Sequence, residues 1–161
     1  MATVYLSLGS NLGDRDGYLE KSRQAIRGSF PNARFSNVYE TEPVEYREQP
    51  WFLNQVAELI TEWPPETLLE WVQRLENRMG RQRKIPKGPR TLDVDILLYG
   101  EKTAKGNQLT LPHPGLIRRR HVLVPLLELA ADKVLPGFGF TVADALKNVK
   151  DDSRVKVHAQ P

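Results

Sequence analysis

The sequence predicts one mixed α/β domain in which helices pack on a central β-sheet. Segments with the alternating or continuous apolar pattern of strands interleave along the chain with segments of helical period. The chain has 161 residues, the size of one ordinary domain, and 40% of them are hydrophobic, which is enough for a substantial core. We therefore expect a single domain over residues 1–161, with helices covering one sheet. The pattern does not predict the order of the strands.

The first half of the chain supplies three strands and one helix. The apolar and β-branched segments that predict these strands are residues 3–8, 34–39 and 52–61. The segment 9–13 ends the first strand, and we interpret it as a tight turn because it lacks the lysine and the glycine spacing of phosphate-binding loops. Asp14 or Asp16 then caps a helix that ends near Ser29.

The second half adds helices around one strongly apolar strand. Pro64 and Pro65 suit the start of a helix whose apolar stripe ends at Gly80. Two more helices are expected at residues 122–131 and 141–148, and Pro125 should lie in the first turn of the former. Strands are predicted at residues 92–99 and 108–111. The polar tail from about residue 151 is expected to be loosely ordered.

Composition excludes several classes of protein. The chain contains no cysteine, so it has no disulfide scaffold, thiolate zinc site, iron–sulfur cluster or cysteine nucleophile. No apolar run approaches the roughly 20 residues that span a membrane, and the first residues do not resemble a secretory signal. We therefore expect a cytoplasmic protein. The net charge of +3 is too small by itself to indicate a nucleic-acid partner.

Asp93 and Asp95 are the sharpest candidates for chemistry. Side chains alternate along a strand, so both carboxylates should point to one face, and Val94, Ile96 and Leu98 to the other. Adjacent carboxylates repel each other unless they are solvated or bridged by a hard cation. Mg²⁺ is bound by one or two carboxylates together with substrate phosphates. A solvated strand end is the alternative, but the apolar strand and a nearby arginine favour a metal site for a nucleotide.

The segment 81–90 precedes this pair and carries cations without any acid. Its cationic residues are Arg81, Arg83, Lys84, Lys87 and Arg90. Arginine side chains bind phosphate oxygens in pairs, so this density beside two carboxylates predicts a polyphosphate site. The alternatives are a solvated basic loop and a nucleic-acid patch. The glycine and prolines of the segment could also let it close over a substrate.

Two further groups of residues are weaker candidates on their own. Asn54 carries one acceptor and two donors, which suit the amide-like edge of a flat ring, and Phe52 could stack on that ring. Core aromatics with a capping asparagine are the alternative. His113 lies between two prolines and could donate to a phosphate or merely pack. The arginines at 118–120 are either solvated or a further anion site.

Several segments in order resemble the 6-hydroxymethyl-7,8-dihydropterin pyrophosphokinase family. The most specific is Gly-Pro-Arg-Thr-Leu-Asp-Val-Asp-Ile-Leu at residues 88–97. The others are residues 8–13, 39–43, 49–54, 80–81, 111–114, 119 and 122–126. The resemblance covers residues 3 to about 131. It implies an α+β, ferredoxin-like fold, with helices packed on a central, mostly antiparallel β-sheet.

The resemblance also implies an activity and its cofactors. The family transfers the diphosphate of ATP to the hydroxymethyl group of the reduced pterin, giving AMP and the pterin diphosphate, a step towards folate. ATP is the co-substrate, and two Mg²⁺ ions are implied. The implied partners are therefore ATP and a reduced pterin, without nucleic acid or membrane, and we expect a monomer. Positioning and charge neutralisation suffice for such a transfer, so no nucleophilic side chain is needed.

Site residues follow from the resemblance position by position. Asp93 and Asp95 correspond to the metal ligands, and Arg81 and Arg90 to the catalytic residues that steady the phosphates. The positions that contact ATP are Gln73, Glu76, Arg83, Ile96, Thr110, His113 and Arg119. The positions that contact the pterin are Thr41, Pro43, Val44, Phe52, Asn54 and His121.

The chain departs from the family pattern at two positions. Lys87 stands where many members have a tryptophan that closes over the pterin. His121 stands where many have phenylalanine on the ring face opposite Phe52, and it can stack while being polar and titratable. Both departures concern the pterin, whereas the metal and phosphate residues are all present.

A non-enzymatic RNA-binding α+β module is the alternative function. A small fold of this class with a basic loop can bind RNA through sheet aromatics. The chain lacks an aromatic pair at strand-centre spacing, and two aspartates stand where RNA phosphate would approach. A two-metal nuclease would need more carboxylates near Asp93 and Asp95 than the sequence offers.

Overall fold

The computed structural model describes residues 1–44, 46–81 and 88–161. Within these residues a six-stranded antiparallel sheet has the order β5-β1-β4-β3-β8, with β2 also paired to β4. Its strands are β1 (Ala2–Ser10), β2 (Arg34–Phe35), β3 (Val38–Thr41), β4 (Phe52–Thr61), β5 (Asp93–Tyr99) and β8 (Val155–Ala159). Two short strands, β6 (Ala104–Lys105) and β7 (Thr110–Leu111), form a separate ribbon.

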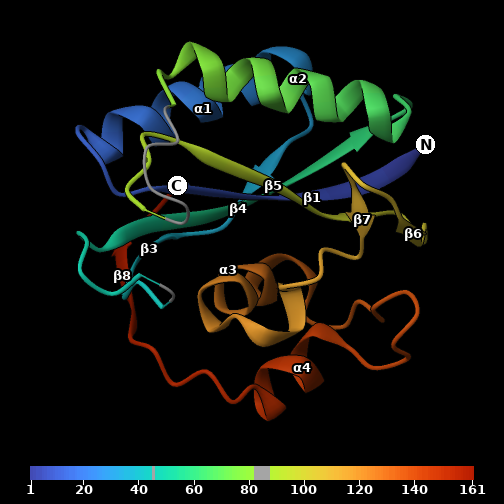
Figure 1. Ribbon diagram of the computed structural model, residues 1–161. Coiled ribbons are helices and arrows are strands. Elements are labelled where there is room, and N and C mark those ends of the chain that lie inside the picture. Colours follow the sequence, from blue (N-terminus) through green and yellow to red (C-terminus); the bar gives the residue numbers. More distant parts are fainter. Residues whose placement is uncertain (45, 82–87) are drawn as a thin grey trace.

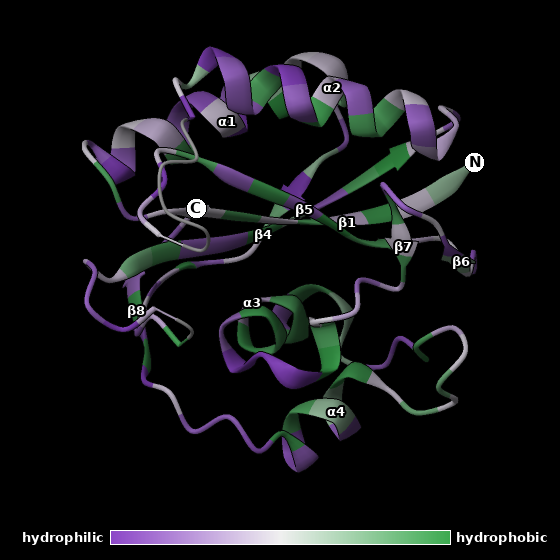
Figure 2. Cartoon of the chain, in the orientation of Figure 1, coloured by the Kyte–Doolittle hydropathy of each residue, from purple (hydrophilic) through white to green (hydrophobic). Residues whose placement is uncertain are grey.

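Helices cover both faces of the sheet (Figure 1). One face is covered by α1 (Arg15–Ser29) and α2 (Pro65–Arg78), the other by α3 (Arg120–Ala130) and α4 (Val142–Asn148). The apolar sides of α1 and α2 point to the sheet, and α3 is largely apolar (Figure 2). The predicted α+β class with helices on a central antiparallel sheet is confirmed. None of the helices in the described ranges is long and apolar enough to cross a bilayer.

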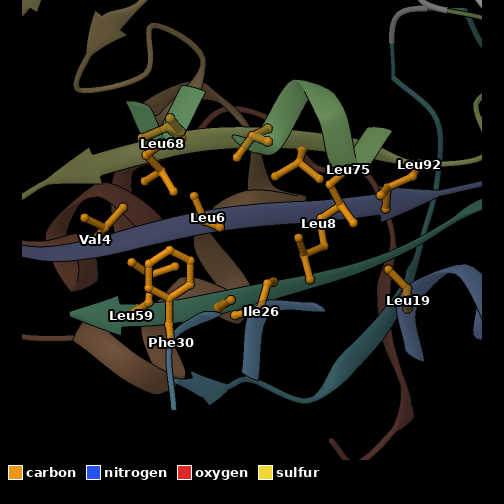
Figure 3. Packing of buried hydrophobic residues seen from close by; sticks show 14 of the residues in the cluster. Val4, Leu6, Leu8, Leu19, Ile26, Phe30, Leu59, Leu68, Leu75 and Leu92 are labelled. Carbon is orange, nitrogen blue, oxygen red and sulfur yellow. The ribbon is translucent and has the colours of Figure 1, made fainter. Parts of the chain in front are cut away.

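The larger of two cores lies between the sheet and the helices α1 and α2. Alternate residues of β1 point into it, as Figure 3 shows for Val4, Leu6 and Leu8. Leu68 and Leu75 of α2 meet them, and all five side chains are fully buried. Burial of such a side chain stabilises the fold by roughly 1.5–3 kcal/mol. Because the central strands are buried on both faces, they form a rigid floor for the residues at their ends.

The strand predicted at residues 34–39 is two strands. Ser36 interrupts the pairing because its side chain takes part in the ladder: its hydroxyl accepts from the Val56 N–H at 2.9 Å. The Ser36 carbonyl accepts from the Gln55 side chain at 2.7 Å. The chain therefore shifts between β2 and β3, and β3 continues to Thr41, two residues beyond the prediction.

One face assignment on β5 was wrong. Val94, Ile96 and Leu98 were predicted to share the face opposite the carboxylates. Val94 and Ile96 lie in the larger core, but Leu98 lies in the second core with α3. The pairing with β1 is irregular here, because Tyr5 faces Leu98 whereas the next residue, Leu6, faces Ile96. The extra residue reverses the alternation beyond this point, as a β-bulge does. Asp93 and Asp95 precede the irregularity and keep the predicted common face.

The start of α3 also differs from the prediction. The helix begins at Arg120, so Pro125 lies beyond its first turn. A tertiary contact explains the earlier start, because the Arg120 N–H donates to the carboxylate of Asp151 at 3.0 Å. This carboxylate satisfies one of the unpaired donors at the helix N-terminus.

The expectation of a loosely ordered tail was wrong. Residues Val155–Ala159 form β8, which pairs antiparallel with β3, with Val155 opposite Thr41 and Val157 opposite Tyr39. The pairing supplies main-chain hydrogen bonds that the polar composition of the tail did not reveal. The tail thereby becomes an edge of the sheet beside the residues predicted to bind the pterin.

Candidate active site

A cavity of about 450 Å³ opens where the first half of β5 meets the ends of β1, β3 and β4 and the start of α3. It gathers residues that are far apart in the sequence. They include predicted catalytic, metal-binding and pterin-binding residues and two of the predicted ATP-binding residues. Those that line it are Thr41, Pro43, Val44, Phe52, Asn54, Arg81, Arg90, Asp93, Asp95, His113, Arg119 and His121. The structure therefore brings the carboxylate pair, the arginines and the ring-binding residues into one space.

The carboxylate pair stands on β5 beside two small residues of β1. Asp93 lies opposite Gly9, and Asp95 opposite Ser7. A Cβ atom on Gly9 would approach the Asn54 side-chain nitrogen to 2.8 Å, so a larger residue at position 9 would displace this amide. The small residues leave the space above the carboxylates open. The alternation of side chains along β1 could have placed Ser7 and Gly9 on one face of the strand. Only the pairing register shows that they lie opposite Asp95 and Asp93.

Arg81 joins the end of α2 to the start of β5. Its Nη1 donates to Glu76 Oε2 at 2.7 Å and to Asp93 Oδ1, and 10% of its side chain is exposed. Glu76 also accepts from the Val94 N–H at 2.9 Å. Burial tends to lower the pKa of Arg81, but the charges of Asp93 and Glu76 outweigh it, so that the pKa is raised and the guanidinium stays charged. A fixed cation thus lies beside Asp93.

Arg90 is held at its main chain and reaches two groups with its side chain. Its N–H donates to Asn11 Oδ1 at 2.8 Å, and its carbonyl accepts from the Asn11 N–H at 3.0 Å. Its Nη1 lies 3.4 Å from Asp93 Oδ2, and its guanidinium lies 5.3 Å from the centre of the Phe52 ring. Arg90 therefore stands between the carboxylates and the aromatic wall. The sequence reading missed Asn11, because a buried asparagine inside a turn carries no distinct pattern.

Asp95 is the strained member of the pair. Burial and the negative charge of Asp93 raise its pKa well above its ordinary value, against the opposing charges of Arg119 and Arg81. A carboxylate in this position is stabilised by any cation that binds between it and Asp93. The two carboxylates are hard oxygen donors and therefore fit Mg²⁺. In the described part of the chain no group of three or more His, Cys, Asp or Glu side chains could hold a metal ion, so phosphate oxygens of a substrate would suit the remaining positions.

His113 is oriented by its own turn. Its Nδ1 accepts from the Gly115 N–H at 3.0 Å, so in the neutral ring the proton is on Nε2, which faces Asp95 Oδ1 at 3.8 Å. Burial, followed by the positive charge of Arg119, lowers the pKa of His113. The residue is therefore neutral near pH 7 and offers one N–H to the cavity.

The opposite wall has the features of a site for a flat polar ring. Thr41 and Asn54 stand on neighbouring strands, and the Thr41 hydroxyl donates to Asn54 Oδ1. This bond fixes the amide and leaves its NH₂ group to donate, with one weak contact to the Leu8 carbonyl at 3.4 Å. Phe52 and Pro43 supply apolar surface next to it, and His121 lines the cavity from α3.

The comparison with known proteins decides the family. A model of the family described as 7,8-dihydro-6-hydroxymethylpterin-pyrophosphokinase (HPPK) matches residues 5–131. The chain belongs to this family. Membership confirms the predicted family and, with it, the class of a pterin pyrophosphokinase of folate synthesis. The alternative of a non-enzymatic RNA-binding module is not supported.

Bacterial relatives match over most of their length. The chain is similar to the 2-amino-4-hydroxy-6-hydroxymethyldihydropteridine pyrophosphokinase of Bacillus subtilis, with 44% identity over 131 residues, 78% of this chain and 77% of the relative. The protein of the same name from Haemophilus influenzae is 38% identical over 161 residues, 98% of this chain and 99% of the relative.

Other relatives are much longer proteins. The folic acid synthesis protein fol1 of Pneumocystis carinii is 38% identical over 150 residues, which are 92% of this chain but 20% of that protein. Among solved structures, an HPPK-DHPS of Plasmodium falciparum superimposes with a TM-score of 0.73 at 13% identity, over 91% of this chain and 43% of that one. This likeness shows the same fold. The chain thus spans a fifth of the fungal protein and under half of the Plasmodium one.

Some predicted HPPK positions lie outside the cavity. Ile96 is buried in the larger core, and Glu76 is engaged with Arg81 and β5. Gln73 lines a second hollow of about 1140 Å³ between the start of α2 and the β6–β7 ribbon. The Thr110 hydroxyl lies 3.4 Å from the Gly106 carbonyl. Arg83 and Lys87 lie outside the described residues.

The cavity also has lining residues that the sequence reading did not single out as site residues. They are Ser7, Gly9, Glu42, Tyr46, Gln49, Pro89 and Val122. Most are neighbours in sequence of predicted residues, so proximity along the chain was the available signal. Which of them face the cavity depends on side-chain direction at loops, which the sequence does not indicate.

The strained carboxylate leads to a prediction about stability. Asp95→Asn should raise the melting temperature of metal-free protein at pH 8, because a neutral amide avoids both the cost of burying a charge and the repulsion with Asp93. The pKa of Asp95 is higher in the folded protein than its unfolded value of 3.8. Protonated Asp95 therefore stabilises the folded state fully below pH 3.8, and this stabilisation is lost as the pH rises through the pKa of the folded protein. Because 38% of the Asp95 side chain is exposed, solvent screens the repulsion. We therefore expect Asp95→Asn to increase the free energy of unfolding by about 1 kcal/mol, which corresponds to a rise in melting temperature of about 2–4 °C.

The measurement is thermal unfolding in a chelator at several pH values. The difference between variant and wild type should be largest at about pH 8 and shrink towards about pH 5. Asp132→Asn, on an exposed residue, serves as the control. An Asp95→Asn protein that melts at or below the wild-type temperature at pH 8 would contradict the assignment of strain to Asp95.

Proposed function

We propose that the chain transfers the diphosphate of ATP to the hydroxymethyl group of 6-hydroxymethyl-7,8-dihydropterin, giving AMP and the pterin diphosphate. The observation that carries this proposal is one cavity that holds both halves of the chemistry. Asp93, which contacts both Arg81 and Arg90, lines one side with Asp95, and the pair Thr41–Asn54 lies at the other. The names of the bacterial relatives support the same reaction.

The transfer requires that the two substrates be held in line and that the negative charge of the phosphates be neutralised. The hydroxymethyl oxygen attacks the β-phosphorus of ATP, the bond from that phosphorus to the oxygen bridging to the α-phosphate breaks, and AMP leaves with that oxygen. The proton of the hydroxyl passes to solvent. Negative charge moves towards the leaving AMP, and the fixed cations Arg81 and Arg90 stabilise it there. The roles of these two arginines are part of the proposal.

Asp93 and Asp95 would hold Mg²⁺, and two ions are proposed. When bound, the ions neutralise charge on the phosphate oxygens and favour loss of the hydroxyl proton. The carboxylates' own part is to fix the place of the phosphates at the start of a rigid strand. In the structure Arg81 and Arg90 both contact Asp93. Phosphate binding would give these arginines further anionic partners.

ATP would lie along the edge of β5 that does not pair with β1. The Val94 N–H donates to Glu76 rather than to β1, so the main-chain groups of Ile96, two residues on, also face away from β1. We propose that Ile96 contacts the nucleotide through its main chain. His113 and Arg119 would donate to phosphates from the cavity wall, and the predicted roles of Gln73, Glu76, Arg83 and Thr110 complete this proposal.

The pterin would occupy the wall formed by β3 and β4. Phe52 stacks on the ring, His121 faces it from α3, and Thr41, Pro43 and Val44 border it. The fixed amide of Asn54 donates to an acceptor on the ring edge.

Asn54→Leu tests this wall. The variant should raise the KM for the pterin by about 10- to 100-fold, because a buried ring acceptor loses its donor. The KM for ATP should change by less than about 2-fold. Steady-state kinetics with each substrate varied in turn measure both values. An equal rise in both KM values would count against a pterin-specific role for Asn54.

A coupled assay for AMP release tests the function as a whole. Folded protein with ATP, Mg²⁺ and 6-hydroxymethyl-7,8-dihydropterin should release AMP, and chelation of the metal should stop the reaction. Absence of AMP from folded protein with both substrates would reject the proposal. We also propose a cytoplasmic monomer without nucleic-acid partners, since one chain supplies the whole described wall of the cavity. Light scattering checks the monomer.

A further inference from the structure

The segment from Asp151 to Val155 connects two walls of the cavity. It follows α4 and returns to the edge of the sheet, where it continues as β8 (Figure 1). It lies beyond residues 5–131, which match the family model. Both of its ends bond to elements that carry predicted pterin-binding residues.

One end of the segment is fixed to α3. Asp151 Oδ2 accepts from the Arg120 N–H at 3.0 Å, and its Oδ1 accepts from the Ser153 N–H at 2.9 Å. Burial tends to raise the pKa of Asp151, but these hydrogen bonds outweigh it and hold the pKa below its usual value. The carboxylate is thus charged at the N-terminus of a helix whose next residue is His121.

The other end is fixed where β3 stops. The Glu42 N–H donates to the Arg154 carbonyl at 3.0 Å, and the Arg154 N–H donates to Glu42 Oε1 at 3.2 Å. The Arg154 side chain adds a bond to Glu42 Oε2 at 3.3 Å. Glu42 lines the cavity between Thr41 and Pro43. Three hydrogen bonds between Arg154 and Glu42 therefore hold the end of β3 against the segment.

These two attachments are only three residues apart. A short chain with both ends bonded fixes the separation of the elements to which it is bonded. Ser153, in its middle, is buried, so the segment packs against the protein rather than crossing solvent. The first turn of α3 and the end of β3 face each other across the site for the ring, and a misplacement of about 1 Å can cost a large factor in rate or binding.

We propose that Asp151 and Arg154 are positioning residues that set the width of the pterin site, by tying the first turn of α3 to the end of β3. The proposal rests on the proposed function, because it assigns the ring to this wall. It adds residues outside the region matched by the family, and neither is placed in contact with substrate.

The test is steady-state kinetics of Asp151→Ala, Asp151→Asn and Arg154→Ala, with Asp152→Ala as the matched control. Asp152 is an exposed carboxylate next to Asp151. Asp151→Ala should raise the KM for the pterin by about 5- to 20-fold. Arg154→Ala should raise it by about 2- to 5-fold, since the main-chain contacts to Glu42 remain. Asp151→Asn keeps one acceptor and should recover part of the loss.

The pattern among substrates separates positioning from general destabilisation. Arg154→Ala should leave the KM for ATP within about 2-fold, whereas Asp151→Ala raises it modestly because Arg119 adjoins the same turn. The double variant should be less impaired than the product of the single effects, because either change frees the same segment. Melting temperatures identify any variant that fails to fold, and Asp151→Asn then carries the test.

Two results would overturn the inference. One is a pterin KM for Asp151→Ala and Arg154→Ala that equals that of Asp152→Ala. The other is a lower kcat with both KM values unchanged, which is the sign of a smaller folded fraction. If the wild-type protein turns over the pterin and these variants do not differ from it, only the inference fails. If the wild-type protein releases no AMP, the proposed function fails and the inference falls with it.

Discussion

Asp95→Ala is expected to lower turnover by at least about 10³-fold, the loss that follows when several kcal/mol of metal-based charge stabilisation are removed. The reason is geometric. Arg81 and Arg90 both form ion pairs with Asp93. The pKa of Asp95 is raised by burial and by the negative charge of Asp93, so a cation bound between the two carboxylates would stabilise its charged form. Release of AMP at saturating ATP and pterin measures the effect.

The variant should remain folded, because Asp95 contributes strain rather than stability to metal-free protein. Mg²⁺ should raise the melting temperature of the wild-type protein in the presence of an ATP analogue and should have a much smaller effect on Asp95→Ala. Asp132→Ala is the control for a lost surface carboxylate. Turnover by Asp95→Ala within about 10-fold of wild type would remove Asp95 from the metal site.

Arg90→Ala is expected to lower kcat by about 10²- to 10³-fold while changing the dissociation constant of ATP by less than about 5-fold. Its guanidinium lies between Asp93 and the ring of Phe52, where the transferred group would pass from nucleotide to pterin. Arg81 is held by Glu76, and in the proposed reaction it contacts the bound phosphates. Arg90 should therefore matter more when charge develops than when ATP binds.

Separate measurements of binding and turnover test this assignment. Titration with a non-hydrolysable ATP analogue gives the dissociation constant, and single-turnover AMP release gives the rate of the chemical step. Arg118→Ala removes an exposed arginine whose side chain contacts the Pro114 carbonyl, and it should leave both quantities nearly unchanged. A large loss of ATP binding with an unchanged chemical step would make Arg90 a binding residue instead.

Asp95 also shows why stability and function oppose each other in this cavity. Two carboxylates on one strand repel each other in the metal-free protein, and Asp95→Asn should relieve that cost while removing a proposed metal ligand. The rigid floor of buried leucines beneath β1 keeps such a pair in place. Local instability at a site is tolerated when the surrounding packing determines the position of its groups.

Much of the fold and site could be predicted because local patterns carried the information. The strand Phe52–Thr61 lies where its apolar residues place it, and α1 begins after Asp14, whose side chain accepts from the Gly17 N–H. The common face of Asp93 and Asp95 follows from alternation alone. The basic segment and the carboxylate pair adjoin each other in sequence, so their proximity in space could be expected.

Predictions failed where a contact distant in sequence overrode the local pattern. Leu98 changed face because of an irregular pairing with β1, which no single strand encodes. The helix α3 begins early because Asp151, thirty-one residues away in sequence, caps it. The polar tail is ordered because the edge of β3 offers it hydrogen-bonding partners.

The sequence by itself determined the class of fold, the candidate carboxylates and arginines of the site, and the family to which the chain belongs. These properties depend on residue type and short spacing, which are local. Only the tertiary structure decided that Asn11 holds Arg90, that Thr41 fixes the amide of Asn54, and that the tail ties α3 to β3. Those contacts depend on strand register and on the approach of distant segments, and they exist only once the chain has folded.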